Sequence, residues 1–208
     1  MLRASPCRSD GSERAPLSTA LGRAGLPISI EEFDGLAADS SHRFEIEDGR
    51  LLVMIRPAGP HIKAARRLAN CLDDQLPDDL ESMVEFEAEL TGPSPRRIPD
   101  LVVCFSEVGD QVRVRAAEIL LAVEIVSPGE SAARDYIKKP AEYAANGIPT
   151  TWVIDIQENP HSLTVYTLDD TGQYHFTSPI TGTYTGPVSG HQVTVDLDAL
   201  TGPRRRRS

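Results

Sequence analysis

Long apolar runs and paired cysteines are both missing from this 208-residue sequence. No apolar stretch reaches the roughly 20 residues that a membrane-spanning helix needs, so no membrane association is expected. The first 25 residues lack the apolar centre of a secretory signal. The three cysteines, Cys7, Cys71 and Cys104, are widely spaced and form no CxxC pair. Neither a disulfide framework nor a zinc site is indicated, and a reduced, cytoplasmic compartment is expected.

An overall excess of positive charge is missing as well. The formal net charge is −10, and residues 26–203 carry 13 basic against 29 acidic residues. This balance argues against a general nucleic-acid coat protein. Eight of the 13 basic residues nevertheless fall into three short groups: Lys63, Arg66 and Arg67; Arg96 and Arg97; Arg134, Lys138 and Lys139. These groups are either chance clusters of solvated charges or local contacts for phosphate groups.

One folded domain is expected over residues 27–200, between a disordered N-terminal tail (1–26) and a basic C-terminal tail (201–208). Apolar spacings of three and four predict a helix over 61–76, and a second long helix is predicted over 133–147. A short helix is predicted within 27–37. Alternation and turn residues predict strands or hairpins over 43–55, 83–90, 98–105, 118–126, 150–156, 163–176 and 192–197. This order indicates an α/β or α+β fold in which helices flank a single mixed sheet.

Glu124 is unusual because it lies in the otherwise aliphatic segment "ILLAVEIVSP" (119–128). A buried carboxylate must take up a proton or find a partner. Asp100 follows Pro99 at the start of another predicted strand. Taken singly, Asp100 is typical of a turn. Taken singly, Glu124 is typical of a buried acid that is paired with an arginine. Two carboxylates on adjacent strands would instead repel each other, and Mg²⁺ or Mn²⁺ would relieve that cost and could activate a water for attack on phosphorus.

Phosphodiester cleavage also needs a cation near the developing negative charge. Lys138 and Lys139 lie close to the start of the second long helix, because Pro140 fits only the first turn. Successive helical residues point about 100° apart, so only one lysine can face the carboxylates. We predict that it is Lys139, which shares a helical face with Tyr143. Alternatively, both lysines are solvated surface residues.

In their order along the chain, these motifs resemble the PD-(D/E)XK nuclease superfamily and, more closely, the Uma-two-type restriction endonucleases. The resemblance covers about residues 27–170. It is carried by Glu124-Ile125-Val126-Ser127-Pro128, Asp135 to Lys139, Tyr143, Gly147-Ile148-Pro149, Trp152, the hairpin motif from Glu45 to Leu51, and Pro60-His61. The chain departs from the family pattern at Pro60-His61, which lacks an intervening residue.

The resemblance implies a restriction-endonuclease-like core and a metal-dependent DNA endonuclease whose catalytic lysine has migrated from the strand to the following helix. It implies that Asp100 and Glu124 hold Mg²⁺ or Mn²⁺, with Glu45 as an additional ligand, and that Lys139 is catalytic. Glu45 could equally be a solvated strand residue. The residues expected at the rim or in contact with substrate are His61, Arg97, Lys138 and Tyr143. His61 could equally be a residue that only starts the helix.

A different class of function is a catalytically silent relative that acts as an interaction or regulatory module. The complete set of Asp100, Glu124 and Lys139 favours the nuclease. Another hydrolase type has little support, because no G-x-S-x-G, P-loop or H-E-x-x-H motif is present. Cutting both strands of DNA would be consistent with a homodimer, although no residue indicates one.

Overall fold

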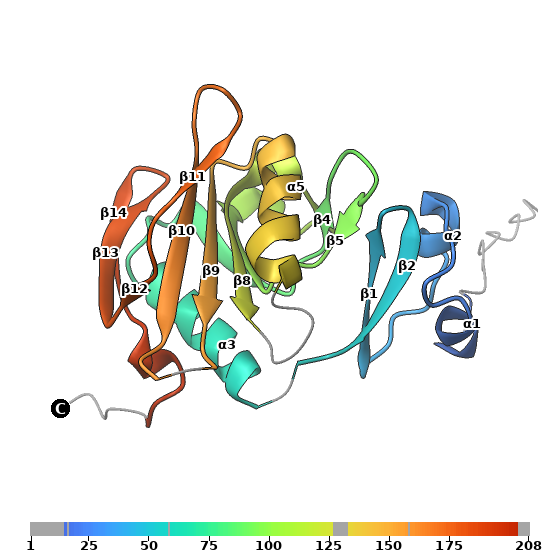
Figure 1. The fold of residues 1–208 in the computed structure, drawn as a ribbon, viewed down its shortest axis with the longest axis horizontal. Coiled ribbons are helices and arrows are strands. Elements are labelled where there is room, and N and C mark those ends of the chain that lie inside the picture. The colour runs from blue at the N-terminus through green and yellow to red at the C-terminus, as the bar shows by residue number, and fades with distance from the viewer. Residues whose placement is uncertain (1–14, 16, 58, 127–132, 158, 204–208) are drawn as a thin grey trace, which may run out of the picture.

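The computed structural model describes residues 15, 17–57, 59–126, 133–157 and 159–203 (Figure 1). It confirms the mixed α and β class, but the expected single sheet is divided into sheets of seven, five and two strands. Within the described ranges, none of the helices is long and apolar enough to cross a membrane. The chain leaves the seven-stranded sheet after Val84 and returns to it at Leu101, and residues 88–89 and 96–97 in between belong to the five-stranded sheet.

The seven-stranded main sheet holds the predicted central strands. Its members are β3 (Leu80–Val84), β6 (Leu101–Phe105), β8 (Ile119–Val126), β9 (Thr150–Asp155), β10 (Ser162–Leu168), β11 (Tyr174–Phe176) and β12 (Ile180–Thr181). β8 lies in the middle, antiparallel to β6 and parallel to β9. The crossover from β8 to β9 carries a π-helical turn, η3 (Arg134–Lys138), which continues into α5 (Lys139–Ala145).

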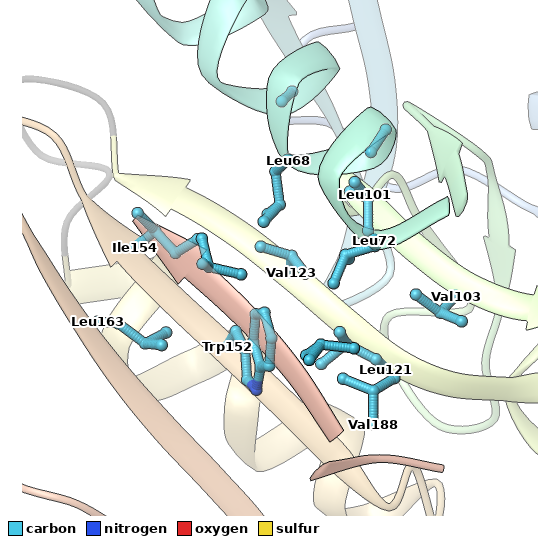
Figure 2. Close-up of a cluster of buried hydrophobic side chains, with 14 of the residues drawn as sticks. Leu68, Leu72, Leu101, Val103, Leu121, Val123, Trp152, Ile154, Leu163 and Val188 are labelled. Atoms are coloured by element: carbon cyan, nitrogen blue, oxygen red, sulfur yellow. The ribbon is translucent and has the colours of Figure 1, made fainter. Parts of the chain in front are cut away.

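Helices cover both faces of this sheet, which is why β8 is apolar on both sides. On one face, α3 (Pro60–Asp73) buries Leu68 and Leu72 against β6 and β8, with Trp152 of β9 in the same cluster (Figure 2). The two-stranded sheet of β13 (Thr183–Val188) and β14 (His191–Asp196) closes that cluster. On the other face, α5 buries Tyr143. The helices predicted over 61–76 and 133–147 are therefore confirmed, the second with a π-helical start.

The five-stranded sheet is built around the predicted hairpin of β1 (His42–Glu47) and β2 (Arg50–Ile55). Its turn is Asp48-Gly49, where both residues have positive φ, 50° and 71°, as a tight hairpin turn requires. The other members are β4 (Ala88–Glu89), β5 (Arg96–Arg97) and β7 (Val114–Arg115). Short 3-10 turns complete the chain: η1 (Ser106–Val108), η2 (Ala116–Glu118) and η4 (Asp198–Leu200).

Two sequence predictions need correction. The strand predicted over 83–90 is wrong as a single element, because β3 ends at Val84, Glu85 has a positive φ of 52°, and β4 belongs to the other sheet. The segment expected as an N-terminal tail contains α1 (Leu17–Gly22), whose Ala20 is buried near α2 (Ile30–Asp34) and the hairpin. Residues 1–14, 16 and 204–208 lie outside the described residues.

Candidate active site

Asp100 and Glu124 lie on neighbouring strands at one end of the main sheet. Asp100 directly precedes β6, and Leu101 pairs with Val123 of β8, so Asp100 falls opposite Glu124. Both carboxylates are buried, and both line a cavity of about 210 Å³ together with Asp135 and Lys139. The juxtaposition expected from the sequence is present. Ser127 and Pro128 of the same motif lie outside the described residues.

Glu124 owes its place in an apolar strand to two partners on α5. Its Oε2 accepts a hydrogen bond from Lys139 Nζ at 2.6 Å, and its Oε1 accepts one from the Tyr143 hydroxyl at 2.5 Å. Burial raises the pKa of Glu124 to about 8. Lys139 opposes this rise, whereas the negative charges of Asp100 and Asp135 add to it. The negative charge on Glu124 is therefore only partly compensated by its neighbours.

Asp100 is held by a different set of donors. Its Oδ1 accepts from Arg43 at 2.9 Å, and its Oδ2 accepts from the backbone N–H of Ile125 at 2.7 Å and lies 3.1 Å from His61 Nε2. His61 Nε2 also lies 3.0 Å from the Ile125 carbonyl oxygen, and two acceptors require a proton on this nitrogen. Although burial opposes ionisation, His61 and Arg43 hold the pKa of Asp100 well below its usual range. His61 lies inside the site rather than at its rim.

The two adjacent lysines point in different directions. Lys139 Nζ faces Glu124 and also lies 3.8 Å from Asp135 Oδ1 and 4.0 Å from Glu45 Oε1. Burial disfavours its charge, but these carboxylates hold the pKa of Lys139 well above its ordinary value. Lys138 points elsewhere, with its Nζ 2.6 Å from Asp48 Oδ2. Lys139 and not Lys138 therefore faces the carboxylates, as the helical spacing predicted.

Glu45 does not line the cavity but lies next to Lys139, which does. It is fully buried, which rules out the solvated alternative, and its oxygens accept from Arg97 at 2.9 Å and from the Ile98 N–H at 3.1 Å. Arg97 donates to Glu142 at 2.7 Å and to Glu47 at 3.1 Å as well. Glu45 thus helps to position Lys139 and is not among the residues that line the cavity.

Two residues expected to touch substrate are enclosed instead. Arg97 and Tyr143 are both fully buried and bonded to carboxylates, so their observed contacts hold acidic side chains in place. Lys138 remains about one-third exposed at the edge of the site. His61 is buried against Asp100.

Residues of the first two basic groups also hold parts of the fold together. Lys63 donates to the Thr201 carbonyl oxygen at 2.7 Å and Arg67 to that of Gly202 at 2.7 Å, which fixes the C-terminal turn against α3. Arg96 is buried and paired with Asp34. Of the three basic groups, that of Arg134, Lys138 and Lys139 lies at the candidate site, where Arg134 and Lys139 line the cavity. Arg66 of the first group is exposed, and contact between the basic groups and phosphate stays a prediction.

Two functional candidates escaped sequence reasoning. Arg43 lines the cavity and holds Asp100. The period-two pattern of β1 would have indicated Arg43 as a candidate, because Arg43 is two residues before Glu45 and lies on the same face of the strand. Asp135 entered only as a motif position, yet it is buried in the site, and burial, opposed by Lys139 and reinforced by Asp100, raises its pKa to about 6.

A bound metal would have two carboxylates available here. In the part of the chain that the structure describes, no three or more His, Cys, Asp and Glu side chains are grouped to hold a metal ion. Asp100 and Glu124 nevertheless fit the hard-oxygen chemistry of Mg²⁺, which is commonly held by one or two carboxylates and completed by water. The partly compensated charge of Glu124 is consistent with that fit.

Comparison with known proteins identifies the relatives of this fold and site. The Uma2 family, described as "Putative restriction endonuclease", matches residues 30–189. The chain belongs to this family. A solved structure described as "a putative nuclease belonging to DUF820", from Anabaena variabilis, is similar over 84% of this chain and 98% of its own, with 18% identity and a TM-score of 0.62. At that identity the likeness shows the fold, and it confirms the nuclease-like core that the sequence resemblance implied. No curated protein matches the sequence.

Proposed function

We propose that this chain is a metal-dependent DNA endonuclease of the PD-(D/E)XK type, with its lysine on the helix that follows the second acidic strand. The observation that carries the proposal is the 2.6 Å contact between Lys139 Nζ and Glu124, in a cavity that Asp100 also lines. Membership of the Uma2 family and the nuclease fold support it. The net reaction would consume one water and convert a phosphodiester into a phosphate monoester and a hydroxyl.

Asp100 and Glu124 would hold Mg²⁺ or Mn²⁺ in this proposal. When bound, the metal would supply Lewis-acid chemistry, polarising a phosphoryl oxygen and acidifying a water. The raised pKa of Glu124 favours this placement, because a divalent cation would relieve the repulsion from Asp100 and Asp135. Glu45 would act from behind, through Lys139.

The chain's own groups would then have distinct tasks. Lys139 would orient the attacking water or a phosphate oxygen as a point charge that does not compete for metal. Tyr143 and His61 would fix the orientations of Glu124 and Asp100. Lys138, partly exposed, would contact the DNA backbone, so binding should be local and salt-sensitive.

A catalytically silent nuclease fold is the second candidate, and one observation favours it. Both oxygens of Asp100 and both oxygens of Glu124 already accept hydrogen bonds from the protein. Arg43 and Lys139 thus act as built-in cations, which could make the pocket stable without a metal. Such a protein would bind a partner without cutting it.

The two candidates separate in one experiment on the full chain. Supercoiled plasmid and circular single-stranded DNA are incubated with the protein in Mg²⁺, Mn²⁺ or chelator, while calorimetry follows Mn²⁺ binding. The nuclease predicts metal-dependent nicking that Glu124→Gln abolishes, together with weakened Mn²⁺ binding in that variant. DNA that stays intact in both metals, with no heat of Mn²⁺ binding, would establish the silent alternative.

A further inference from the structure

Arg43 belongs to the wall of the cavity rather than to the support behind it. On β1 it shares one face with Glu45 and Glu47, and its side chain reaches Asp100, which directly precedes β6 of the main sheet. Unlike Glu45, Arg43 lines the cavity together with Asp100, Glu124 and Lys139. Its side chain is only 8% exposed, so its position is fixed by the protein.

Two carboxylates hold the Arg43 guanidinium in place. Its NH1 lies 2.9 Å from Asp100 Oδ1 and 3.7 Å from Glu85 Oε1. Glu85 is itself paired with Arg56 and adopts a positive φ, which is uncommon for a residue with a side chain and is often found near functional sites. The planar group is therefore oriented before any ligand arrives.

Arg43 also retains hydrogen-bonding capacity that Lys139 has largely used. Its Nε is buried and has no hydrogen-bond partner among the described residues. Nε itself is closed off from the cavity, but among the described residues the guanidinium, which carries five N–H donors, donates a hydrogen bond only from NH1 to Asp100, so donors remain for a ligand. The Lys139 ammonium, in contrast, faces Glu124, Asp135 and Glu45.

We propose that Arg43 is a second cationic catalytic residue, which donates hydrogen bonds to a non-bridging oxygen of the scissile phosphodiester. This inference rests on the proposed nuclease function. As a water oxygen bonds to phosphorus and the ester bond breaks, the water loses one proton and the leaving oxygen gains one. Arg43 exchanges no proton in this step and stabilises the charge on the phosphoryl oxygens through its planar fork.

The test compares Arg43→Gln and Arg43→Lys with Arg115→Gln, which removes an exposed arginine that pairs with Glu118 and does not line the cavity. Single-turnover cleavage and DNA affinity are measured on a mapped plasmid site with Mn²⁺. We expect Arg43→Gln to lower the cleavage rate by about 100-fold or more, the effect of losing one oxyanion donor, with DNA affinity within about threefold. Arg43→Lys should recover only part of the rate, and Arg115→Gln should cleave at the wild-type rate.

A second readout separates catalysis from support. A single phosphorothioate at the cut site should slow the wild-type protein, and this slowing should shrink in Arg43→Gln because the contact is already lost. If Arg43→Gln cleaves DNA as fast as the wild-type protein, the proposed role of Arg43 is wrong, whereas the proposed nuclease function is retained. Full recovery by Arg43→Lys with an unchanged sulfur effect would assign Arg43 to positioning Asp100 only. If Arg43→Gln fails to fold, the Arg43→Lys rates and sulfur effect decide the matter. A wild-type protein that cuts nothing would remove both proposals together.

Discussion

The main-sheet core and the junction between the two larger sheets are both buried, but the core is built from apolar side chains and the junction from charged ones. Around α3 the core consists of aliphatic side chains and Trp152 (Figure 2). At the junction, where the β1–β2 hairpin meets the main sheet, the buried side chains are charged: Arg43, Glu45, Arg97, Asp100, Glu124, Asp135 and Lys139. Apolar burial stabilises a fold, whereas buried ion pairs roughly balance their desolvation cost. This difference is consistent with the proposal that the junction serves chemistry, whereas the core stabilises the fold.

The largest effect, a loss of DNA cleavage, is expected when the lysine at the junction is replaced. Lys139→Ala should lower DNA cleavage by at least about 1,000-fold, because an electrostatic stabiliser is lost. Folding should persist, because Glu124, whose pKa is already raised to about 8, can take up a proton when its partner disappears. Plasmid nicking and thermal melting check both parts. Lys138→Ala is the matched control and should weaken DNA binding only. Equal loss of cleavage in both variants would contradict the assigned helix rotation.

Breaking the junction should also destabilise the protein. Arg97→Met leaves Glu45, Glu47 and Glu142 without their shared cation, and losing one partner of a buried pair costs about 3–5 kcal/mol. Urea unfolding measures the free energy change. The control is Arg115→Met, an exposed pair with Glu118 that should change stability by less than about 1 kcal/mol. Similar losses from both variants would mean that the junction pairs behave like surface charges.

A substitution in the core should lower stability and leave activity unchanged. Leu72→Ala opens space between α3 and the sheet and should cost about 2–5 kcal/mol in unfolding free energy. Below its lowered melting temperature, the variant should cleave DNA at the wild-type rate, because Leu72 has no contact with the cavity. Urea unfolding and plasmid nicking on the same sample test this. A fall in cleavage per folded molecule would show that core and junction are coupled.

The most gradual effect, at most about tenfold for each pH unit, concerns pH. The pKa of Glu124 is raised from 4.5 to about 8, so the native protein keeps a proton that the unfolded chain loses between these values. For the metal-free protein, this group makes stability fall as pH rises across that window. A bound metal must displace the proton, so Mn²⁺ affinity should rise with pH by up to about tenfold per unit and level off near pH 8. Calorimetry measures the slope, which Glu124→Gln should remove.

The core and three residues of the junction were predictable from sequence, but the ion-pair partners within the junction were not. Period-three and period-four spacing located α3, and the ordered motif located Asp100, Glu124 and Lys139, because both signals are local. The partners of Arg97 are Glu45, Glu47 and Glu142, which lie 52, 50 and 45 residues away, and no periodicity encodes such pairings. The turn at Glu85 was missed for a similar reason, since the alternation of residues 83–90 continues through a point where the chain changes sheets.

The site gathers side chains from opposite ends of a long stretch of chain, from Arg43 on β1 to Lys139 on α5, and from two sheets (Figure 1). During synthesis the hairpin with Arg43 emerges well before α5 does. A nascent or partly unfolded chain can therefore have a complete hairpin or a collapsed core and still lack the assembled cavity. The wide spacing makes the chemistry an all-or-none property of the finished molecule, which would protect nearby nucleic acid from half-folded copies.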